Sequence, residues 1–259
     1  MYTISGVPLD NPSRDWSVDS RTRALAELTR DLAQVRAQGR DGVVPVGGGS
    51  VQAPVWGLYV RTPIAGREAL IALVQGGTAL TLGGRTLGYT VAGVSVADEN
   101  YAVGHTVILF SLRLDGVFWR AGEVTSGAVT LGSASVDVTG LFPGLSAPVQ
   151  DALVRVKGAV SGLRVTDASG AWFTYAGVLT GSQWLRFESN SGRAFVTSSD
   201  TWTGGTEVSG DVDFGGPRGV FEITPAWSDP STRAGVLTVA TGTRSAASVQ
   251  VRGRGSFVV

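Results

Sequence analysis

The 259-residue sequence contains no cysteine and a single histidine, His105. Without cysteine the chain cannot form disulfides, thiolate metal sites or a cysteine nucleophile. One imidazole excludes every catalytic or metal-binding arrangement that needs two histidines. The opening MYTISGVPLD lacks the basic and apolar regions of a secretion signal, and no apolar run is long enough to cross a bilayer. We therefore expect a soluble chain with no membrane segment.

Charge is scarce and balanced. Charged residues make up 16% of the chain, against about a quarter in an average protein, and 21 basic side chains oppose 21 acidic ones. The balance also holds within residues 1–122, which carry 11 basic and 10 acidic side chains. A dedicated nucleic-acid-binding protein normally has a basic domain or stripe, which this sequence lacks.

Glycine, in contrast, is abundant. The chain has 37 glycines, 10 prolines and 43% hydrophobic residues, with no fixed repeat. This composition indicates a globular chain rich in tight turns rather than a disordered or collagen-like one. Its length is enough for two ordinary domains, each with its own core.

The first 41 residues differ from those that follow. They hold 12 charged residues, whereas residues 42–122 hold nine. The change indicates an exposed arm, residues 10–41, that leads into a compact body. Within the arm, Leu25, Leu28, Leu32 and Val35 recur at three- and four-residue steps and predict a short amphipathic helix.

The body of the first domain, residues 1–122, has mostly strand periodicity. Residues 55–61 and 90–96 alternate as strands, and residues 79–82 and 85–88 form a predicted hairpin across Gly83-Gly84. Residues 67–75 predict the domain's one helix, with Leu70, Leu73 and Val74 on one face. Residues 101–114 are the longest strand candidate. We expect a mainly antiparallel sheet with one helix.

The second domain, residues 123–259, reads as a succession of short strands. The candidates are residues 153–156, 163–167, 172–175, 184–188, 193–198, 220–224, 235–240 and 247–252. Two of the connections, Asp167–Gly170 and Ser189–Gly192, are glycine-terminated hairpin turns. Their spacing predicts an all-β sandwich.

The sequence contains no convincing catalytic motif. His105 alternates with Val103 and Val107 on a predicted strand, and no GxSxG motif is present for it to serve, so a structural or surface role is favoured over a Ser-His-Asp triad. The carboxylate pairs Asp98-Glu99 and Asp211/Asp213 could in principle serve acid-base chemistry or share a calcium ion, but solvated turns explain them better. No glycine cluster has a phosphate-binding pattern. We expect no enzyme activity, cofactor or metal.

Seven tryptophans are the one enriched feature that suggests binding. Five lie in or next to the second domain: Trp119, Trp172, Trp184, Trp202 and Trp227. Exposed aromatic rings could stack on sugars or anchor a partner protein, although a place in the sandwich core is favoured for the set. Trp202, within Asp200-Thr-Trp-Thr-Gly-Gly, is the best candidate for an exposed glycan or partner contact.

Several short segments follow one another in an order that spans both halves. In the first half they are Ile4–Asp10 with Trp16, Gly39–Pro45, Arg67–Val74, Thr81–Arg85 and Phe118–Arg120. In the second half they are Phe142–Gly144 with Ala147-Pro148, Thr166–Gly170, Trp184–Glu188, Ser191–Arg193 and Phe221–Pro225. By their order and spacing the chain resembles the distal tail proteins of long-tailed, non-contractile bacteriophages. No single segment is specific for that family.

The resemblance implies an N-terminal β-sandwich or split-barrel-like domain with one helix and a C-terminal galectin-like β-sandwich. It also implies a homo-hexameric ring in the virion, made in the host cytoplasm, that joins the tail tube protein to the tail-tip hub protein and carries receptor-binding proteins. The charged arm, with Arg40, Asp41 and Gly42, would then contact the adjacent subunit, and DNA would only pass through the neutral lumen.

Two features depart from the family pattern. Cellular galectins bind galactosides through a histidine-containing strand set, but His105 lies in the first domain, so no sugar-binding residues can be transferred. The resemblance indicates extended structure near Asp31–Val35, where periodicity predicts helix, and residues 22–36 stay open between the two. A carbohydrate-binding adhesion module is the alternative to a ring protein, and a glycan hydrolase survives only through Asp98, Glu99, Asp211 and Asp213.

Overall fold

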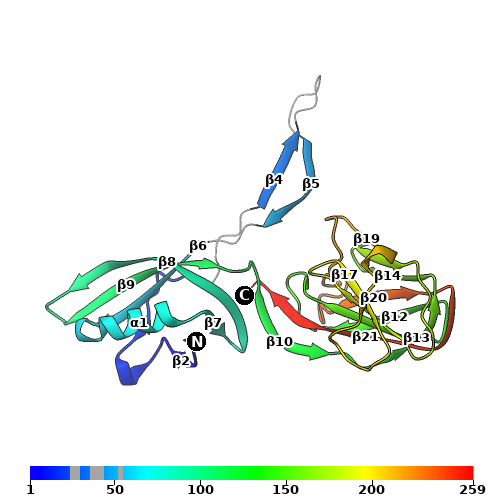
Figure 1. Ribbon diagram of the computed structural model, residues 1–259. Coiled ribbons are helices and arrows are strands. Elements are labelled where there is room, and N and C mark those ends of the chain that lie inside the picture. Colours follow the sequence, from blue (N-terminus) through cyan, green and yellow to red (C-terminus); the bar gives the residue numbers. More distant parts are fainter. Residues whose placement is uncertain (24–29, 36–43, 52–54, 259) are drawn as a thin grey trace. The chain divides into compact units, whose positions relative to one another are not determined.

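The computed structural model describes residues 1–23, 30–35, 44–51 and 55–258. These residues form two compact units, one built on Met1–Ala121 and the other on Gly122–Phe257. Strand β10 (Trp119–Thr125) carries the chain from the first to the second. Most of the described residues lie in antiparallel strands, with one α-helix among them (Figure 1), which confirms the predicted mainly β class.

The N-terminal unit is organised around one very long strand. β8 (Arg85–Asn100) pairs through its first residues with β7 (Ala79–Leu82), and from Tyr89 onward with β9 (His105–Leu114). β9 pairs in turn with β6 (Val55–Pro63), and β6 with β3 (Ser17–Val18). On the other side β7 pairs with β1 (Tyr2–Ile4), which pairs with β2 (Val7–Pro8). β8 therefore belongs to two groups of strands.

The predicted hairpin and helix of this unit are both confirmed. β7 and β8 meet across Gly83 and Gly84, whose φ angles of 56° and 79° lie in the left-handed region that a two-residue turn requires. Helix α1 (Arg67–Gly76) follows the 3-10 turn η2 (Ile64–Gly66) and buries Leu70 and Val74. The hydroxyl of Tyr89, on β8, donates a hydrogen bond of 2.8 Å to the carbonyl of Val74 and so ties the helix to the sheet.

Two predictions for the first unit were incomplete, and one open question is answered. Near Asp31–Val35 the extended structure that the family resemblance indicates is confirmed over the helix that periodicity alone favours: strand β4 (Arg30–Val35) pairs with β5 (Val44–Val51), and residues 24–29 lie outside the described part. Asp98 and Glu99 lie in β8 rather than in a loop, and residues 101–104 form the turn before β9. β8 is consequently longer than the strand predicted to be the longest. Register shifts at Gly93 and near Asp98 let β8 continue through a polar stretch that resembles a loop.

The C-terminal unit is a sandwich of two antiparallel sheets. One sheet contains β18 (Thr206–Glu207), β17 (Arg193–Thr197), β16 (Trp184–Glu188), β13 (Leu153–Ser161) and β21 (Thr243–Phe257), with β11 (Val129–Thr130) beside β21. The other contains β12 (Ser135–Leu141), β20 (Gly235–Ala240), β14 (Leu163–Asp167), β15 (Trp172–Tyr175) and β19 (Val212–Gly215). Phe173 stacks on Phe187 at 4.2 Å between ring centroids and meets Phe221 edge-on, at the centre of the core between the sheets.

One predicted strand of this unit does not form. Within residues 220–224 the strand pairing is reduced to one isolated bridge, between Val149 and Ile223, and a second isolated bridge follows between Pro225 and Gly235. The segment from Phe221 to Pro225 is buried at every position, so it does not alternate between a core face and a solvent face. It fills the sandwich as an irregular buried segment rather than extending a sheet.

Candidate functional site

The candidate binding tryptophans direct attention to the outer face of the sheet that contains β13, β16 and β17. Along β13, Val154 and Val156 point into the core, so Arg155 and Lys157 lie on the opposite face. The strand register places Arg155 opposite Arg186, and Lys157 opposite Trp184. A row of cations and aromatic rings therefore crosses the outer face of this sheet.

Arg155 is the centre of this row, although its side chain is only 4% exposed. Its guanidinium carbon lies 4.1 Å from the ring centroid of Trp184 and 4.2 Å from that of Trp202. Its Nη1 lies 2.7 Å from a carboxylate oxygen of Asp200, and its Nη2 donates a 2.6 Å hydrogen bond to Gln250. A buried guanidinium needs such partners, because an unpaired charge there would be costly.

Trp202 is therefore not the freely exposed ring that the sequence suggested. It is half-buried, and the guanidinium of Arg155 already contacts its ring. Nη1 of Arg155 also donates to the carbonyl of Thr201, so Asp200, Thr201 and Trp202 are all bound by one side chain. This arrangement fixes the segment between β17 and β18 against the sheet. Whether Trp202 contacts a glycan or partner stays a prediction.

The other tryptophans divide as expected for a set that mainly serves the core. Trp16, Trp56, Trp119 and Trp184 are buried, and Trp172 is half-buried. Trp227 is the exception, with 64% of its surface exposed. It lies in the connection before β20, and the sequence alone gave no reason to prefer it over Trp202.

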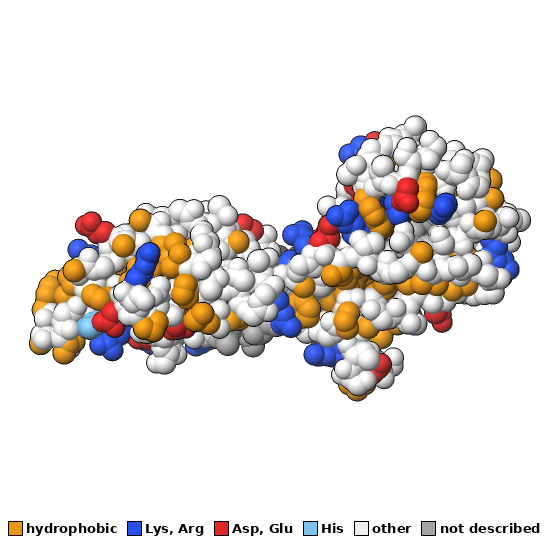
Figure 2. All heavy atoms as spheres, turned by 90° about the horizontal axis from the view of Figure 1, so that it is seen from below, with side chains coloured by type: hydrophobic (Ala, Val, Ile, Leu, Met, Phe, Trp, Pro, Cys, Tyr) orange, Lys and Arg blue, Asp and Glu red, His pale blue; other side chains and the backbone are white. Residues whose placement is uncertain are grey.

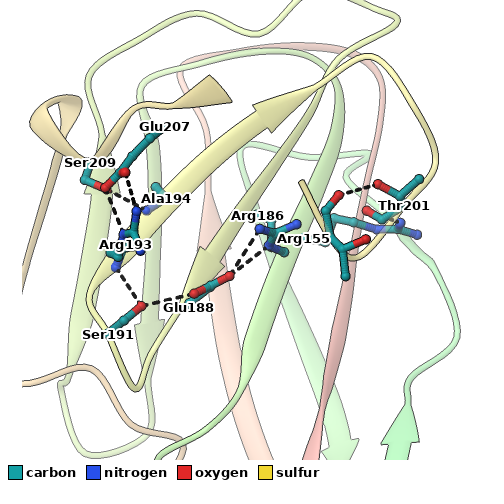
Figure 3. A network of polar contacts seen from close by, with 10 residues as sticks. Arg155, Arg186, Glu188, Ser191, Arg193, Ala194, Thr201, Glu207 and Ser209 are labelled. Carbon is teal, nitrogen blue, oxygen red and sulfur yellow. Dashed lines mark hydrogen bonds and ion pairs between the residues drawn. The ribbon is translucent and has the colours of Figure 1, made fainter. Parts of the chain in front are cut away.

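A polar network continues from Arg186 toward the edge of the sheet (Figure 3). Arg186 donates to Glu188, which also accepts a hydrogen bond from the hydroxyl of Ser191. Further along, Arg193 binds Glu207 through two nitrogens, and Ser209 donates to the same carboxylate. These hydrogen bonds lower the pKa of Glu207 to about 2, with Arg193 as the largest cause.

The acids in this network offset most of its positive charge. Arg155, Arg186 and Arg193 each have an acidic partner, and Arg252 pairs with Glu123. On the face seen in Figure 2, basic and acidic side chains likewise lie interspersed. The contacts of the cation-aromatic row hold the segment between β17 and β18 against the sheet.

His105 lies in a separate place, at the start of β9. Its Nε2 is 2.7 Å from a carboxylate oxygen of Asp15, and its Nδ1 is 2.8 Å from the carbonyl oxygen of Val103. Both ring nitrogens are therefore engaged with acceptors of the N-terminal unit. The geometry is that of a histidine that fastens the turn before β9 to the segment around Asp15.

The two carboxylate pairs lie in different units. In the N-terminal unit Glu99 lies 3.6 Å from Arg67, whereas Asp98 borders a hollow that Asp19 and Arg21 also line. In the C-terminal unit Asp211 ends the 3-10 turn η3 (Ser209–Asp211) and Asp213 lies in β19, both exposed. Among the described residues, no group of three or more histidine, aspartate or glutamate side chains could hold a metal ion. Within the same ranges, no helix has the length and apolar character needed to cross a membrane.

The predicted interface residues Arg40, Asp41 and Gly42 lie outside the described residues. The contact expected of them therefore stays a prediction.

A solved structure matches the chain over nearly its full length. The Dit protein (gp 19.1) of SPP1, described as a paradigm of the hub adsorption apparatus of phages that infect Gram-positive bacteria, superposes with a TM-score of 0.58. The match covers 98% of each chain at 13% sequence identity. The chain has the fold of SPP1 Dit. The resemblance to distal tail proteins is thereby shown at the level of the fold.

Sequence comparison adds nothing to that match, since no protein-family model and no curated protein matches the chain. The likeness to SPP1 Dit is thus one of fold, at low sequence identity.

The residue that sequence reasoning missed is Arg155. The stretch from Leu153 to Lys157 signals an outward-facing arginine by its alternation. The strand register, which places Trp184 and Trp202 on either side of that arginine, has no local signal in the sequence.

Proposed function

We propose that this chain is a structural protein of a bacteriophage tail. The observation that carries the proposal is the match to SPP1 Dit, which extends over both units rather than over one common β-sandwich. We further propose the specific role that the sequence resemblance implies: a hexameric ring in the virion between the tail tube and the tail-tip hub, with a platform for receptor-binding components. In this role the chain is not an enzyme.

The paired strands β4 and β5 support a role in assembly. They form a two-stranded sheet with each other. Two-stranded sheets are marginally stable in water unless they pack against further structure. In the proposed ring the neighbouring subunit provides that structure, and the charged arm around Arg40 and Asp41 pairs with it across a repeated head-to-tail interface.

The turn between β8 and β9 supports the same role. Tyr101 is 75% exposed and Val103 57% exposed at this turn, and Val96 on β8 is 49% exposed. Neighbouring exposed apolar side chains are typical of surfaces that become covered on association. We propose that they contact another tail component.

Removal of residues 24–54, which include the predicted interface residues Arg40, Asp41 and Gly42, tests the ring directly. Nε1 of Trp56 donates a 2.9 Å hydrogen bond to the carbonyl of Arg23, so a short glycine-serine link can replace residues 24–54 without stretching the body. The full chain should form rings in negative-stain images and a mass above that of the monomer in light scattering. The shortened chain should stay monomeric while its thermal unfolding remains cooperative.

A charge exchange at the predicted interface refines the test. Arg40→Asp or Asp41→Arg alone should lower the ring fraction, and the combined exchange should restore it if the two residues pair between subunits. A strictly monomeric full chain at high concentration would contradict the ring, even if the fold is intact.

A carbohydrate-binding adhesion module remains the second candidate function. Its motivation is the aromatic content of the C-terminal sandwich, with Trp202 as the predicted contact. Retention of the full chain on host cell walls, lost on Trp202→Ala, would favour it. Loss of the Trp202 ring also removes a contact of Arg155. Arg252→Ala is therefore the control, because the guanidinium carbon of Arg252 lies 5.7 Å from the centroid of the same ring and this variant leaves the ring in place.

A further inference from the structure

The C-terminal unit contains a pocket that the proposed structural role does not use. Its volume is about 550 Å³, within the range of pockets that bind small molecules. Its walls come from β15, β17, β18 and the segments beside them. The lining residues are Tyr175, Val178, Gln183, Val196, Thr197, Ser198, Gly205, Thr206 and Val208.

The lining chemistry is unusual for this chain because none of these side chains carries a charge. Hydroxyl groups come from Tyr175, Thr197, Ser198 and Thr206, and an amide comes from Gln183. Val178, Val196 and Val208 add methyl groups. The pocket thus combines neutral hydrogen-bonding groups with small apolar surfaces.

Two of the polar groups are held in position by the protein. The side-chain oxygen of Gln183 accepts a 2.8 Å hydrogen bond from the backbone N–H of Thr180, which fixes the amide and leaves its NH₂ as a donor. The Tyr175 ring is 6% exposed, and its hydroxyl lies where a Cβ on residue 177 would come within 2.3 Å, so Gly177 makes room for it. Burial raises the pKa of Tyr175, so its hydroxyl stays protonated near neutral pH.

The segment of residues 198–205, which contributes Ser198 and Gly205 to the pocket wall, is also fixed. Arg155 binds Asp200, Thr201 and Trp202 in this segment, while Ser198 and Gly205 at its two ends line the pocket. Gly205 has a φ of +105°, and a Cβ there would lie 2.8 Å from the carbonyl oxygen of Val196. The cation-aromatic row on the outer face therefore supports the pocket wall from outside.

We propose that this pocket binds a neutral saccharide. A sugar ring presents hydroxyl groups at its edge, which pair with hydroxyl and amide groups, and C–H groups on its faces, which pack against methyl groups and an aromatic ring. A charged ligand would lose water without gaining a charged partner from the lining. In this proposal Trp202 is a positioning residue that holds the wall, and the sugar contacts belong to the pocket; in the adhesion-module candidate Trp202 is itself the contact.

The experiment is an NMR titration of the full chain with glucose, galactose and N-acetylglucosamine, beside glucuronate and glucosamine as charged counterparts. At least one neutral sugar should bind saturably, with a Kd on the order of millimolar. The shifted backbone amides should be those of the pocket lining. Saturation by none of the neutral sugars, or tighter binding of a charged one, would overturn the proposal.

Variants locate the site. Gln183→Ala and Tyr175→Phe should each weaken binding by about five- to tenfold, the effect of one lost hydrogen bond. Tyr101→Phe, the same substitution in the N-terminal unit, should leave binding unchanged. Val178 is 69% exposed, so Val178→Trp should block the pocket without disturbing the fold.

The positioning role of Trp202 has its own readout. Trp202→Ala should weaken binding, and Trp202→Phe, which keeps a ring against Arg155, should restore most of it. Unchanged binding in both Gln183→Ala and Val178→Trp would show that the sugar binds elsewhere. Ring formation is measured separately, so failure of the pocket and failure of the tail role are distinguishable.

Discussion

The two units handle polar groups in opposite ways. Among the described residues, every buried charged side chain lies in the C-terminal unit: Arg155, Asp167, Arg186 and Glu222. Among the residues of the N-terminal unit whose burial is described, the buried polar ones are two threonines, Thr62 and Thr106. Both units expose apolar side chains, such as Tyr101 and Val103 in the N-terminal unit and Val178 and Trp227 in the C-terminal unit.

The difference follows from how much irregular backbone each unit buries. Long ladders such as β6–β9 and β8–β9 satisfy their own backbone groups, so the N-terminal unit needs few internal polar side chains. The C-terminal unit buries turns and the irregular segment from Phe221 to Pro225. The carboxylate of Asp167 binds backbone in both: it accepts hydrogen bonds from the N–H groups of Ser169 and Ala171 in a turn, and from that of Thr224 in the irregular segment. The comparison indicates that the C-terminal unit holds its irregular backbone with buried polar side chains, whereas the N-terminal unit relies on its strand ladders.

The largest loss of stability is expected from a substitution in the core of the C-terminal unit. Phe173→Ala removes a fully buried ring that contacts Phe187 and Phe221, and should lower the free energy of unfolding by about 4 kcal/mol. Phe214→Ala, at a ring that is 38% exposed, should cost less than half of that. Urea unfolding followed by near-ultraviolet circular dichroism measures both. Equal losses would show that the core is not centred on Phe173.

The second-largest effect is expected on removal of the buried carboxylate of Asp167, which accepts hydrogen bonds from irregular backbone. Asp167→Ala leaves the N–H groups of Ala171 and Thr224 without their acceptor and should cost about 3 kcal/mol in the same unfolding assay. Asp137→Ala is the matched control, because Asp137 is an exposed partner of Thr238 and should cost under about 1 kcal/mol. A similar cost for both would remove the contrast between buried and exposed acids.

A pair of neighbouring glycines tests the packing of the N-terminal unit. A Cβ on Gly77 would lie 2.4 Å from Ile4 and 2.5 Å from the Tyr89 hydroxyl, so Gly77→Ala should destabilise by about 2 kcal/mol. A Cβ on Gly76 meets nothing within 4 Å, and Gly76→Ala at the end of α1 should be neutral or stabilise by up to about 1 kcal/mol. The unfolding temperature should therefore fall for Gly77→Ala, and it should stay the same or rise for Gly76→Ala.

The smallest effect is a pH dependence of the C-terminal unit. Hydrogen bonds hold the pKa of Glu207 and that of Asp229 at about 2, chiefly from Arg193 and Ser231 respectively. Because these folded-state values lie below the ordinary values of 4.5 and 3.8, the stabilisation is complete above about pH 4.5 and is lost as the pH falls toward 2. Glu207→Gln with Asp229→Asn should flatten the fall in unfolding temperature over that interval. An unchanged slope would assign the acid sensitivity to other groups.

Local patterns predicted those parts of the fold whose cause is local. Gly83-Gly84 between alternating segments determines the β7–β8 hairpin, and the spacing of Leu70 and Val74 determines α1. Local patterns alone did not decide between helix, strand and irregular structure where a segment fitted more than one of them. Leu32 and Val35 fit a helical face, but pairing with β5 makes them part of a strand. Residues 220–224 have strand composition, yet burial on all sides makes them irregular.

The candidate site also has a part that local sequence predicts and a part that it does not. The sequence identified aromatic residues as the notable feature of the second domain, and most of them are at least half-buried, as expected. It could not show that Arg155 contacts both Trp184 and Trp202, or that the uncharged pocket is lined by residues from Tyr175 to Val208, because those residues are brought together by strand register.

By itself, the sequence determined a mainly β chain without disulfides, with one predicted helix and with turns placed by glycine, because composition and short-range periodicity fix backbone preference. Only the tertiary structure decided that β8 joins two groups of strands, that Trp202 is bound by Arg155, and that a neutral pocket lies beside it. Those features depend on contacts between residues far apart in the chain, and the free energy of such contacts is set by the packed fold rather than by any local segment.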